Sequence, residues 1–325
     1  MATIKDIAAR LGVSISTVSK GLNGASDISE ELRQTVLDTA VEMGYSTKRS
    51  RKVENRKLAL FIENMNYESI DEFGYDVVLG CKQNAFKHKW DVDIIPVTPQ
   101  LQAEEKYDTY ILKNGYCGAF LVGFALHDEW MQQLKNTTMP TVLFDNYIEN
   151  NPNVAYVGTD SYEGIDMAVK HLHNLGHKKI AFINGSLFSL VSDQRQEAFE
   201  NSMRDAGLEI YPELMGHGYY IPETAQYYVS NFIAAGATAI LCGSDTIAQG
   251  VILECQLHGF NVPNDISVVG FDDVKFAAAL TPPLTTIRQE RNDLGRCAYI
   301  ILNSLIHHIP ISRTQLRPML IERES

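Results

Sequence analysis

The feature that most constrains the fold is a regular alternation of short apolar runs and longer amphipathic segments from residue 58 onward. Apolar runs of strand length predict strands at 58–63, 91–97, 118–124, 141–146, 179–184, 239–242 and 267–271. Segments with helical periodicity separate them, for example at 75–90, 161–175, 193–206, 224–235, 245–258 and 292–307. Strands alternating with helices of this length form βαβ units and parallel sheets. We therefore predict a two-lobed α/β domain with a ligand cleft between the lobes.

The first 45 residues carry signals for three short helices. A hydroxyl at Thr3 followed three residues later by an acid has the form of a capping box, and Gly12 ends the helix that it opens. Ser14 is the expected N-cap of a second helix, and Ser29 opens a third that runs to Met43. Two helices joined by a three-residue turn predict a helix-turn-helix, whose second helix enters the major groove of DNA. The fold class is thus a small all-α domain followed by the two-lobed α/β domain.

Charge is distributed unevenly along the chain. The net charge is −12, but residues 1–57 hold ten Lys/Arg against seven Asp/Glu, and six of those cations lie between Lys48 and Lys57. A basic segment on an acidic body suits a protein that contacts DNA at one end. A solvated linker with a chance run of charge gives the same pattern, so charge alone does not decide between the two.

Several other classes of protein are disfavoured by what the sequence lacks. The longest apolar runs are half a membrane span, and no secretory segment follows Met1, so we expect a cytoplasmic chain with no membrane partner. The cysteines are scattered and never form a C-x-x-C pair, so we expect no disulfide frame, metal site or cofactor; they are Cys81, Cys117, Cys242, Cys255 and Cys297. No nucleophile elbow, phosphate-binding loop or zinc-protease motif is present, so we do not expect an enzyme.

Distinctive short motifs occur along the whole chain. The N-terminal motifs are Thr3-Ile4-Lys5-Asp6-Ile7-Ala8, Gly12-Val13-Ser14, Thr17-Val18-Ser19, Leu22-Asn23-Gly24 and Met43-Gly44-Tyr45. Later motifs include His171-Leu172, Leu175-Gly176-His177, Ile180-Ala181-Phe182-Ile183 and the runs at 263–273 and 280–287. Together these motifs resemble the LacI/GalR (lactose/galactose repressor) family of transcriptional regulators. The resemblance implies a headpiece at 1–46, a hinge linker at 47–57 and an effector-binding core at 58–325. Its N-lobe would span about 58–160 and 290–317, and its C-lobe about 161–289 and 318–325.

The same resemblance places the DNA contacts on and around the second helix. Ile15, Ser16 and Lys20 fall where the family reads base edges; a lysine can hydrogen-bond guanine, and an isoleucine can touch a thymine methyl. Positions that touch phosphates in the family are occupied by Thr3, Ser14, Ser19 and Asn23. For Ser14 and Ser19, helix capping and solvation are the alternative roles.

The linker departs from the family. Relatives insert a leucine from an alanine-rich hinge helix into the minor groove, whereas residues 46–57 contain no alanine and only one aliphatic side chain, Val53. We expect instead a basic strand in which Arg49, Arg51 and Lys52 contact DNA, which would make affinity strongly salt-dependent. Whether this hinge forms a helix on DNA stays open.

The resemblance also implies an effector site of carboxylates, a guanidinium fork and aromatic faces, the groups that polyhydroxylated ligands need. The expected residues are Glu63, Phe73, Asp145, Arg195, Tyr220, Ser244 and Asp272. Each has an alternative role: capping for Asp272, a surface helix position for Arg195, packing for Tyr220 and a solvated strand end for Glu63. We expect a sugar effector, with a nucleobase or nucleoside as the alternative.

The expected function is thus a repressor that binds a near-palindromic operator as a homodimer and responds to its effector by inducer or corepressor action. The competing class is a free sugar-binding protein without DNA function, which would not carry residues 1–45.

Overall fold

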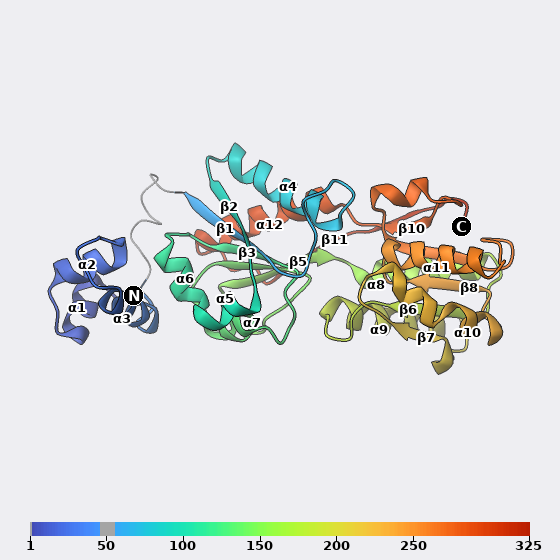
Figure 1. The fold of residues 1–325 in the computed structure, drawn as a ribbon, viewed down its shortest axis with the longest axis horizontal. Helices are drawn as coiled ribbons and strands as arrows, with labels where there is room; N and C mark the ends of the chain where they lie inside the picture. The colour runs from blue at the N-terminus through green and yellow to red at the C-terminus, as the bar shows by residue number, and fades with distance from the viewer. Residues whose placement is uncertain (1, 46–55) are drawn as a thin grey trace. The chain divides into compact units, whose positions relative to one another are not determined.

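The structure, a computed structural model, describes residues 2–45 and 56–325. Three N-terminal helices precede two six-stranded sheets in which parallel pairing predominates, which confirms the predicted fold class (Figure 1). The linker positions Arg49, Arg51 and Lys52 lie outside the described residues, so their DNA contacts stay predictions.

The three N-terminal helices are α1 (Ile4–Leu11), α2 (Ile15–Asn23) and α3 (Glu30–Glu42). The predicted capping box is present at α1, since Thr3 Oγ1 accepts from Asp6 N at 3.3 Å and Asp6 Oδ2 accepts from Thr3 N at 2.8 Å. Ser14 Oγ caps α2 by accepting from the backbone at 3.0 Å, and Ser29 caps α3 in the same way. All three predicted helices are therefore confirmed.

The chain separates into two compact units, the first of which includes the three N-terminal helices. Unit 1 comprises Met1–Met65, Leu79–Val157 and Gly295–Thr314, and unit 2 comprises Asn66–Val78, Gly158–Leu294 and Gln315–Ser325. The unit boundaries near 158, 295 and 315 lie within a few residues of the lobe boundaries that the sequence places at about 160, 290 and 318. Residues 66–78, which the sequence assigned to the N-lobe, group with unit 2.

The first sheet has the strand order β11-β5-β4-β3-β1-β2. Its strands are β1 (Lys57–Ile62), β2 (Asp91–Pro96), β3 (Ala119–Val122), β4 (Thr141–Phe144), β5 (Val154–Thr159) and β11 (Arg313–Leu316). Its associated helices are α4 (Phe73–Lys87), α5 (Pro99–Glu104), α6 (Tyr107–Lys113), α7 (Glu129–Gln133), η2 (Leu134–Asn136) and α12 (Arg291–Ile306).

The second sheet has the order β12-β10-β9-β8-β6-β7; β12 is antiparallel to β10, and the other neighbouring strands of this sheet are parallel. Its strands are β6 (Ile180–Asn184), β7 (Met215–His217), β8 (Ala239–Cys242), β9 (Ser267–Asp272), β10 (Thr285–Arg288) and β12 (Met319–Ile321). Its helices are α8 (Ser161–Asn174), α9 (Leu190–Asp205), η3 (Pro212–Leu214), η4 (Pro222–Tyr227), α10 (Val229–Ala234), α11 (Asp245–Leu257) and η5 (Lys275–Ala279).

Alternate side chains of the second sheet serve two separate cores. Phe182, Leu241 and Phe271 pack with residues of α8 and α9, whereas Ile183 and Cys242 pack with residues of α10 and α11. Because successive strand residues point to opposite faces, strands covered on both sides are apolar throughout. This double burial explains why the strands read as continuous apolar runs in the sequence.

The helix predicted at 224–235 is wrong as a single element. The segment forms the 3-10 helix η4 and the short helix α10, separated at Tyr228, whose φ and ψ are −121° and −40°. The Tyr228 hydroxyl bonds both the N–H and the carbonyl of His217, at 3.2 and 2.9 Å, and its ring packs on Gly216 of β7. These tertiary contacts outweigh the local helical preference at this position.

Among the described residues, no helix combines the length and apolar character that a bilayer crossing requires. Within the same ranges, no group of three or more His, Cys, Asp or Glu is arranged to hold a metal ion.

Candidate DNA-binding and effector sites

The outward face of α2 carries the three residues predicted to read bases. Ile15, with 51% of its surface exposed, Ser16 and Lys20 are all exposed, while Val18 on the opposite face is fully buried. Gly21 lets α2 approach α3 closely, since a Cβ there would lie 2.9 Å from Val36 Cγ1. The helix is therefore seated on α3 by one face and presents the other to solvent.

The side chains predicted to touch phosphates are partly used within the headpiece itself. The Ser14 and Thr3 hydroxyls take part in helix caps, and Asn23 Nδ2 donates to the Ser19 carbonyl at 2.7 Å. These bonds agree with the capping alternative for Ser14 and leave its phosphate contact a prediction, because a hydroxyl can both donate and accept.

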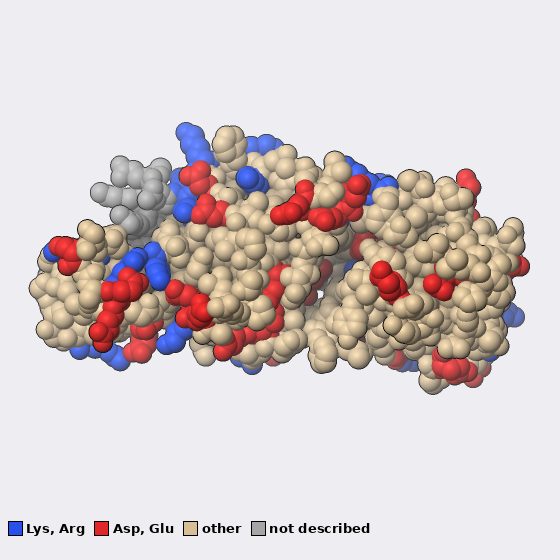
Figure 2. All heavy atoms as spheres, viewed as in Figure 1, with Lys and Arg blue, Asp and Glu red and all other residues tan. Residues whose placement is uncertain are grey.

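Sequence reasoning missed the partner of Lys20. Its ammonium is paired with the carboxylate of Asp27, in the loop between α2 and α3. Figure 2 shows acidic as well as basic side chains on the visible face of the N-terminal helices, and residues 2–45 hold four Lys/Arg against six Asp/Glu. The positive excess of the N-terminal region thus resides in the linker.

In unit 2, polar residues follow four neighbouring parallel strands of the second sheet. Asn184 and Asp272 end β6 and β9, while Ser244 and Gln289 come just after β8 and β10. Carboxyl ends of parallel strands meet at one edge of a sheet, where α/β proteins bind ligands. Gln289 Nε2 donates to Asp272 Oδ1 at 2.7 Å, which joins two of these strand ends directly.

Arg195 is buried at this edge rather than exposed on the surface of α9. It is 3% exposed, its Nη1 donates to the Gly243 carbonyl at 2.6 Å, and its guanidinium carbon lies 3.8 Å from the centre of the Phe271 ring. Its Nε has no hydrogen-bond partner among the described residues. The guanidinium is thus fixed in position, and its buried Nε donor is satisfied by none of the described residues.

Asp272 lies in the field of two arginines. Burial raises the pKa of Asp272 to about 6, while the Arg195 guanidinium, the Gln289 hydrogen bond and the Arg291 guanidinium each act to lower it. Arg291, at the start of α12, is 7% exposed; its Nη2 lies 3.2 Å from Asp76 Oδ2, and its guanidinium lies 5.8 Å from the centre of the Phe73 ring.

Gln289 and Arg291 are candidate site residues that the sequence did not predict. The Gln289 Oε1 and Arg291 Nη1 atoms are buried without a hydrogen-bond partner in the described part of the chain. Both residues follow within four positions of the run at 280–287, which the sequence matches to a family motif without predicting a strand. A strand at β10 places both residues at the candidate ligand-binding edge.

The remaining candidates of unit 2 are held by local contacts. The Tyr220 hydroxyl lies 2.7 Å from Ser192 Oγ, and its ring lies so close to Gly185 that a Cβ there would be 1.9 Å from Cζ. Ser244 is 2% exposed and caps α11, accepting from Ile247 N at 3.2 Å. The Ser244 hydroxyl therefore has a structural role, and its effector contact stays a prediction.

Two of the predicted effector residues, Glu63 and Asp145, belong to unit 1. Glu63 is 3% exposed rather than a solvated strand end, and its Oε2 accepts from Gln102 Nε2 at 2.6 Å. Burial raises the pKa of Glu63 to about 7, with the neighbouring Asp128 carboxylate acting in the same direction. Asp145 follows β4 with a φ of 55°, a left-handed conformation that turns the chain sharply at the strand end.

Comparison with known families gives two matches. Residues 3–48 match bacterial regulatory proteins of the lacI family, and residues 169–325 match a periplasmic binding protein-like domain.

Comparison with individual proteins covers the whole chain. The HTH-type transcriptional repressor PurR of Actinobacillus pleuropneumoniae serotype 3 is 30% identical over 99% of this chain and 95% of its own length. That of Haemophilus influenzae is 30% identical over 100% and 98%. A solved complex of the transcriptional regulator CelR with cellobiose has a TM-score of 0.75 at 25% identity, covering all of both chains. A lac repressor dimer bound to operator and the anti-inducer ONPF has a TM-score of 0.70 at 21% identity over 99% and 98%, a likeness of fold.

Proposed function

Because the chain belongs to the LacI family of bacterial regulatory proteins, we propose that it is a transcriptional repressor whose hold on operator DNA is set by a small sugar bound to unit 2. Members of this family regulate transcription by binding DNA and are not enzymes. The proposal thus concerns the effector, the operator and the residues that contact them.

For DNA, we propose that a homodimer places two α2 helices in successive major grooves of a near-palindromic operator in the cytoplasm. Ile15, Ser16 and Lys20 would read bases, since they form the exposed face of a helix whose other face is buried against α3. Phosphate contacts would come from the headpiece hydroxyls and from the basic linker, because the described headpiece itself has more acids than bases.

The observation that carries the sugar proposal is the mixture of unpartnered donors and acceptors near Asp272. Arg195 Nε and Arg291 Nη1 offer donors, and Gln289 Oε1 offers an acceptor, all buried. A hydroxyl group both donates and accepts, so adjacent hydroxyls of one sugar ring can serve a guanidinium and a carboxyl or amide oxygen together. A bound anion would pair with the two arginines, but the ionised Asp272 carboxylate would repel it. The solved CelR complex with cellobiose supports a sugar.

A nucleobase or nucleoside is the second candidate. The rings of Tyr220 and Phe73 both pack against the same core of unit 2 and offer faces for stacking, and the curated relatives named PurR favour this class. Nucleobases also carry donors and acceptors on one edge, so the polar groups alone do not separate the two.

Thermal unfolding of the full-length protein with a panel of sugars, including cellobiose, and of purine bases and nucleosides separates the candidates. An effector at 100 times its Kd is expected to stabilise the protein by about 2.7 kcal/mol. A shift with a sugar that also changes operator affinity supports the proposal, and a shift with purines alone overturns it in favour of the second candidate. Failure to select any palindromic sequence from a random DNA pool contradicts the repressor function.

A further inference from the structure

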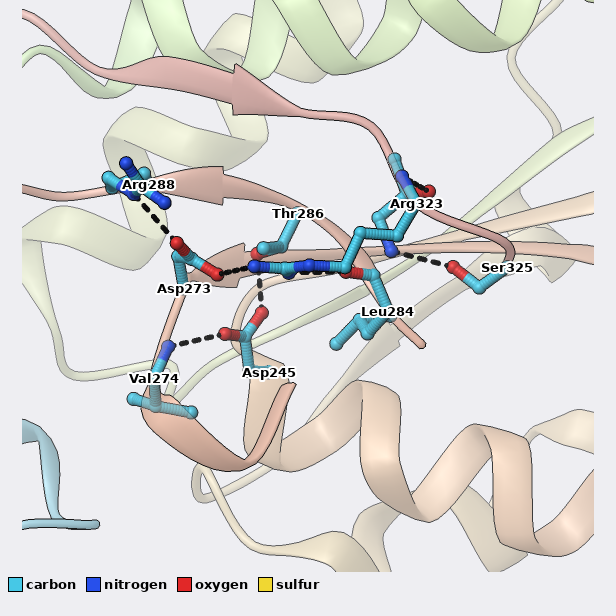
Figure 3. Close-up of polar contacts among 9 residues, drawn as sticks. Asp245, Asp273, Val274, Leu284, Thr286, Arg288, Arg323 and Ser325 are labelled. Carbon is cyan, nitrogen blue, oxygen red and sulfur yellow. Dashed lines mark hydrogen bonds and ion pairs between the residues drawn. The ribbon is translucent and has the colours of Figure 1, made fainter. Parts of the chain in front are cut away.

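Residues 323–325 are bonded to β9 and β10. These strands end at Asp272 and just before Gln289, at the edge of the second sheet where we propose that the effector binds, here called the effector edge. Ser325 Oγ donates to the Val268 carbonyl of β9 at 2.6 Å and accepts from Thr285 N of β10 at 2.8 Å. Arg323 N donates to Thr285 Oγ1 at 3.0 Å. Figure 3 shows the Arg323 side chain extending toward Asp273, which follows β9, while Ser325 lies on the side away from Asp273.

The Arg323 guanidinium joins two parts of that loop. Its Nη2 donates to Asp273 Oδ1 at 2.6 Å, and its Nη1 donates to the Leu284 carbonyl at 2.7 Å. The other oxygen of the Asp273 carboxylate accepts from Arg288 Nε at 2.7 Å. The Asp273 side chain is only 7% exposed, so both of its oxygens are occupied in a place with little water.

The backbone that these bonds hold is strained. Asp272 and Asp273 have φ values of 121° and 52°, conformations that residues with a Cβ rarely adopt. The turn is fixed on its other side by Asp245, whose Oδ2 accepts from Val274 N at 2.9 Å and whose Oδ1 accepts from Thr286 (Figure 3). Such a conformation persists only when its surroundings determine it.

We propose that Arg323 is a positioning residue of the effector site. It fixes the Asp273 carboxylate and, through the turn that the two aspartates share, holds the Asp272 carboxyl beside Arg195. Arg323 needs no contact with the effector to do this. The inference rests on the proposed function only in taking Asp272 as an effector contact.

A forked guanidinium suits this role better than a single charge. Arg323 bridges a carboxylate and a carbonyl with separate nitrogens, and its side chain is 17% exposed, whereas that of Arg288 is 39% exposed. A lysine can replace only one of these bonds. The substitution Arg323→Lys should therefore restore part of what Arg323→Gln removes.

The first test measures amide hydrogen exchange in the full-length protein without added effector. In Arg323→Gln the Val274 amide is expected to exchange at least tenfold faster, with an intermediate rate in Arg323→Lys, while peptides of α8 and of unit 1 are unchanged. Glu324→Gln is the matched control, because that side chain is exposed and forms no ion pair or hydrogen bond with the described residues. Unchanged exchange at 272–274, or equal acceleration across the second sheet, overturns the proposal.

The second test uses cellobiose, glucose and adenine as probes at a temperature well below unfolding. One of these probes is expected to raise the Tm of the wild-type protein. Arg323→Gln is expected to raise the Kd for that probe at least tenfold. Operator affinity without the probe should stay unchanged. A merely structural role would lower the Tm without changing the Kd at this temperature. If the wild-type protein responds to no probe, the proposed function is contradicted. The hydrogen-exchange measurement then still tests whether Arg323 holds the turn at residues 272–274.

Discussion

The ammonium of Lys20, on the exposed face of α2, is paired with the carboxylate of Asp27 in the following loop. Both side chains are about half exposed, at 45% and 59%. An exposed pair of this kind contributes about 0–1 kcal/mol, so a guanine edge or a phosphate can displace the carboxylate. Asp27 therefore competes with DNA for the side chain expected to read the operator.

Replacing Asp27 with asparagine should tighten DNA binding. The substitution frees Lys20 and removes a negative charge beside the phosphates, so operator affinity is expected to rise about three- to tenfold at low salt, with a smaller gain at high salt. Fluorescence anisotropy with labelled operator measures the change. Glu31→Gln removes the same charge from an exposed position on α3 and serves as the control; an equal gain in both variants would mean that net charge, not the pair, is responsible.

The sequence predicts the helices of the headpiece but not all of its side-chain contacts. The starts of α1, α2 and α3 were predicted correctly because Thr3, Ser14 and Ser29 cap their helices through bonds three residues away. The pair of Lys20 with Asp27 was not predicted, because a loop conformation brings the two side chains together. Helix caps depend on residues close in the sequence and can be predicted from it, whereas contacts across a loop depend on the folded conformation of that loop.

At the effector edge, too, the features with a local sequence pattern were predicted and those that depend on distant contacts were not. Asp272 and Arg195 were predicted from motif positions, and the apolar runs that became β6, β8 and β9 were found because they are buried on both faces. The β10 strand, Thr285–Arg288, contains a single aliphatic residue and so does not stand out as an apolar run, and β7 and β12 have only three residues each. Gln289 and Arg291 were missed for that reason, and Arg323 because its partners lie about 40 to 50 residues away.

Asp272→Asn should weaken effector binding while leaving operator binding intact. A charge-assisted hydrogen bond contributes about 1.5–3 kcal/mol, which corresponds to a loss of about 10- to 150-fold in affinity. Because the pKa of Asp272 is raised to about 6, wild-type affinity for an effector that donates to the carboxylate should increase as pH rises through 6, and the variant should lose this dependence. Isothermal titration between pH 5 and 8 measures both effects. Asp265→Asn, in an exposed loop, is the control, and a variant that keeps both affinity and pH profile contradicts the role.

Glu63→Gln should flatten the dependence of stability on pH. The folded-state pKa of Glu63, about 7, lies above its ordinary value of 4.5, so the folded state favours the protonated form. The stabilisation is fully present below about pH 4.5 and is lost as pH rises through about 7. Wild-type Tm should thus fall between pH 6 and 8 by about 2–4 °C more than that of the variant, for a difference on the order of 1 kcal/mol. Differential scanning calorimetry measures it, with exposed Glu149→Gln as the control; parallel curves for wild type and Glu63→Gln would rule the assignment out.

Gly21→Ala should weaken DNA binding by pushing α2 away from α3. Alanine normally favours a helix over glycine by about 1 kcal/mol, but here the new Cβ would lie 2.9 Å from Val36 Cγ1, and overpacking costs about 1–3 kcal/mol. The displaced helix should lose operator affinity and amide protection over Ile15–Asn23. Val36→Ala removes the opposing methyl groups. As a single substitution it should destabilise the headpiece, but combined with Gly21→Ala it should restore most of the operator affinity that Gly21→Ala removes. Additive losses in the double variant, measured by anisotropy and hydrogen exchange, would show that the close approach of the two helices does not position the DNA-reading face.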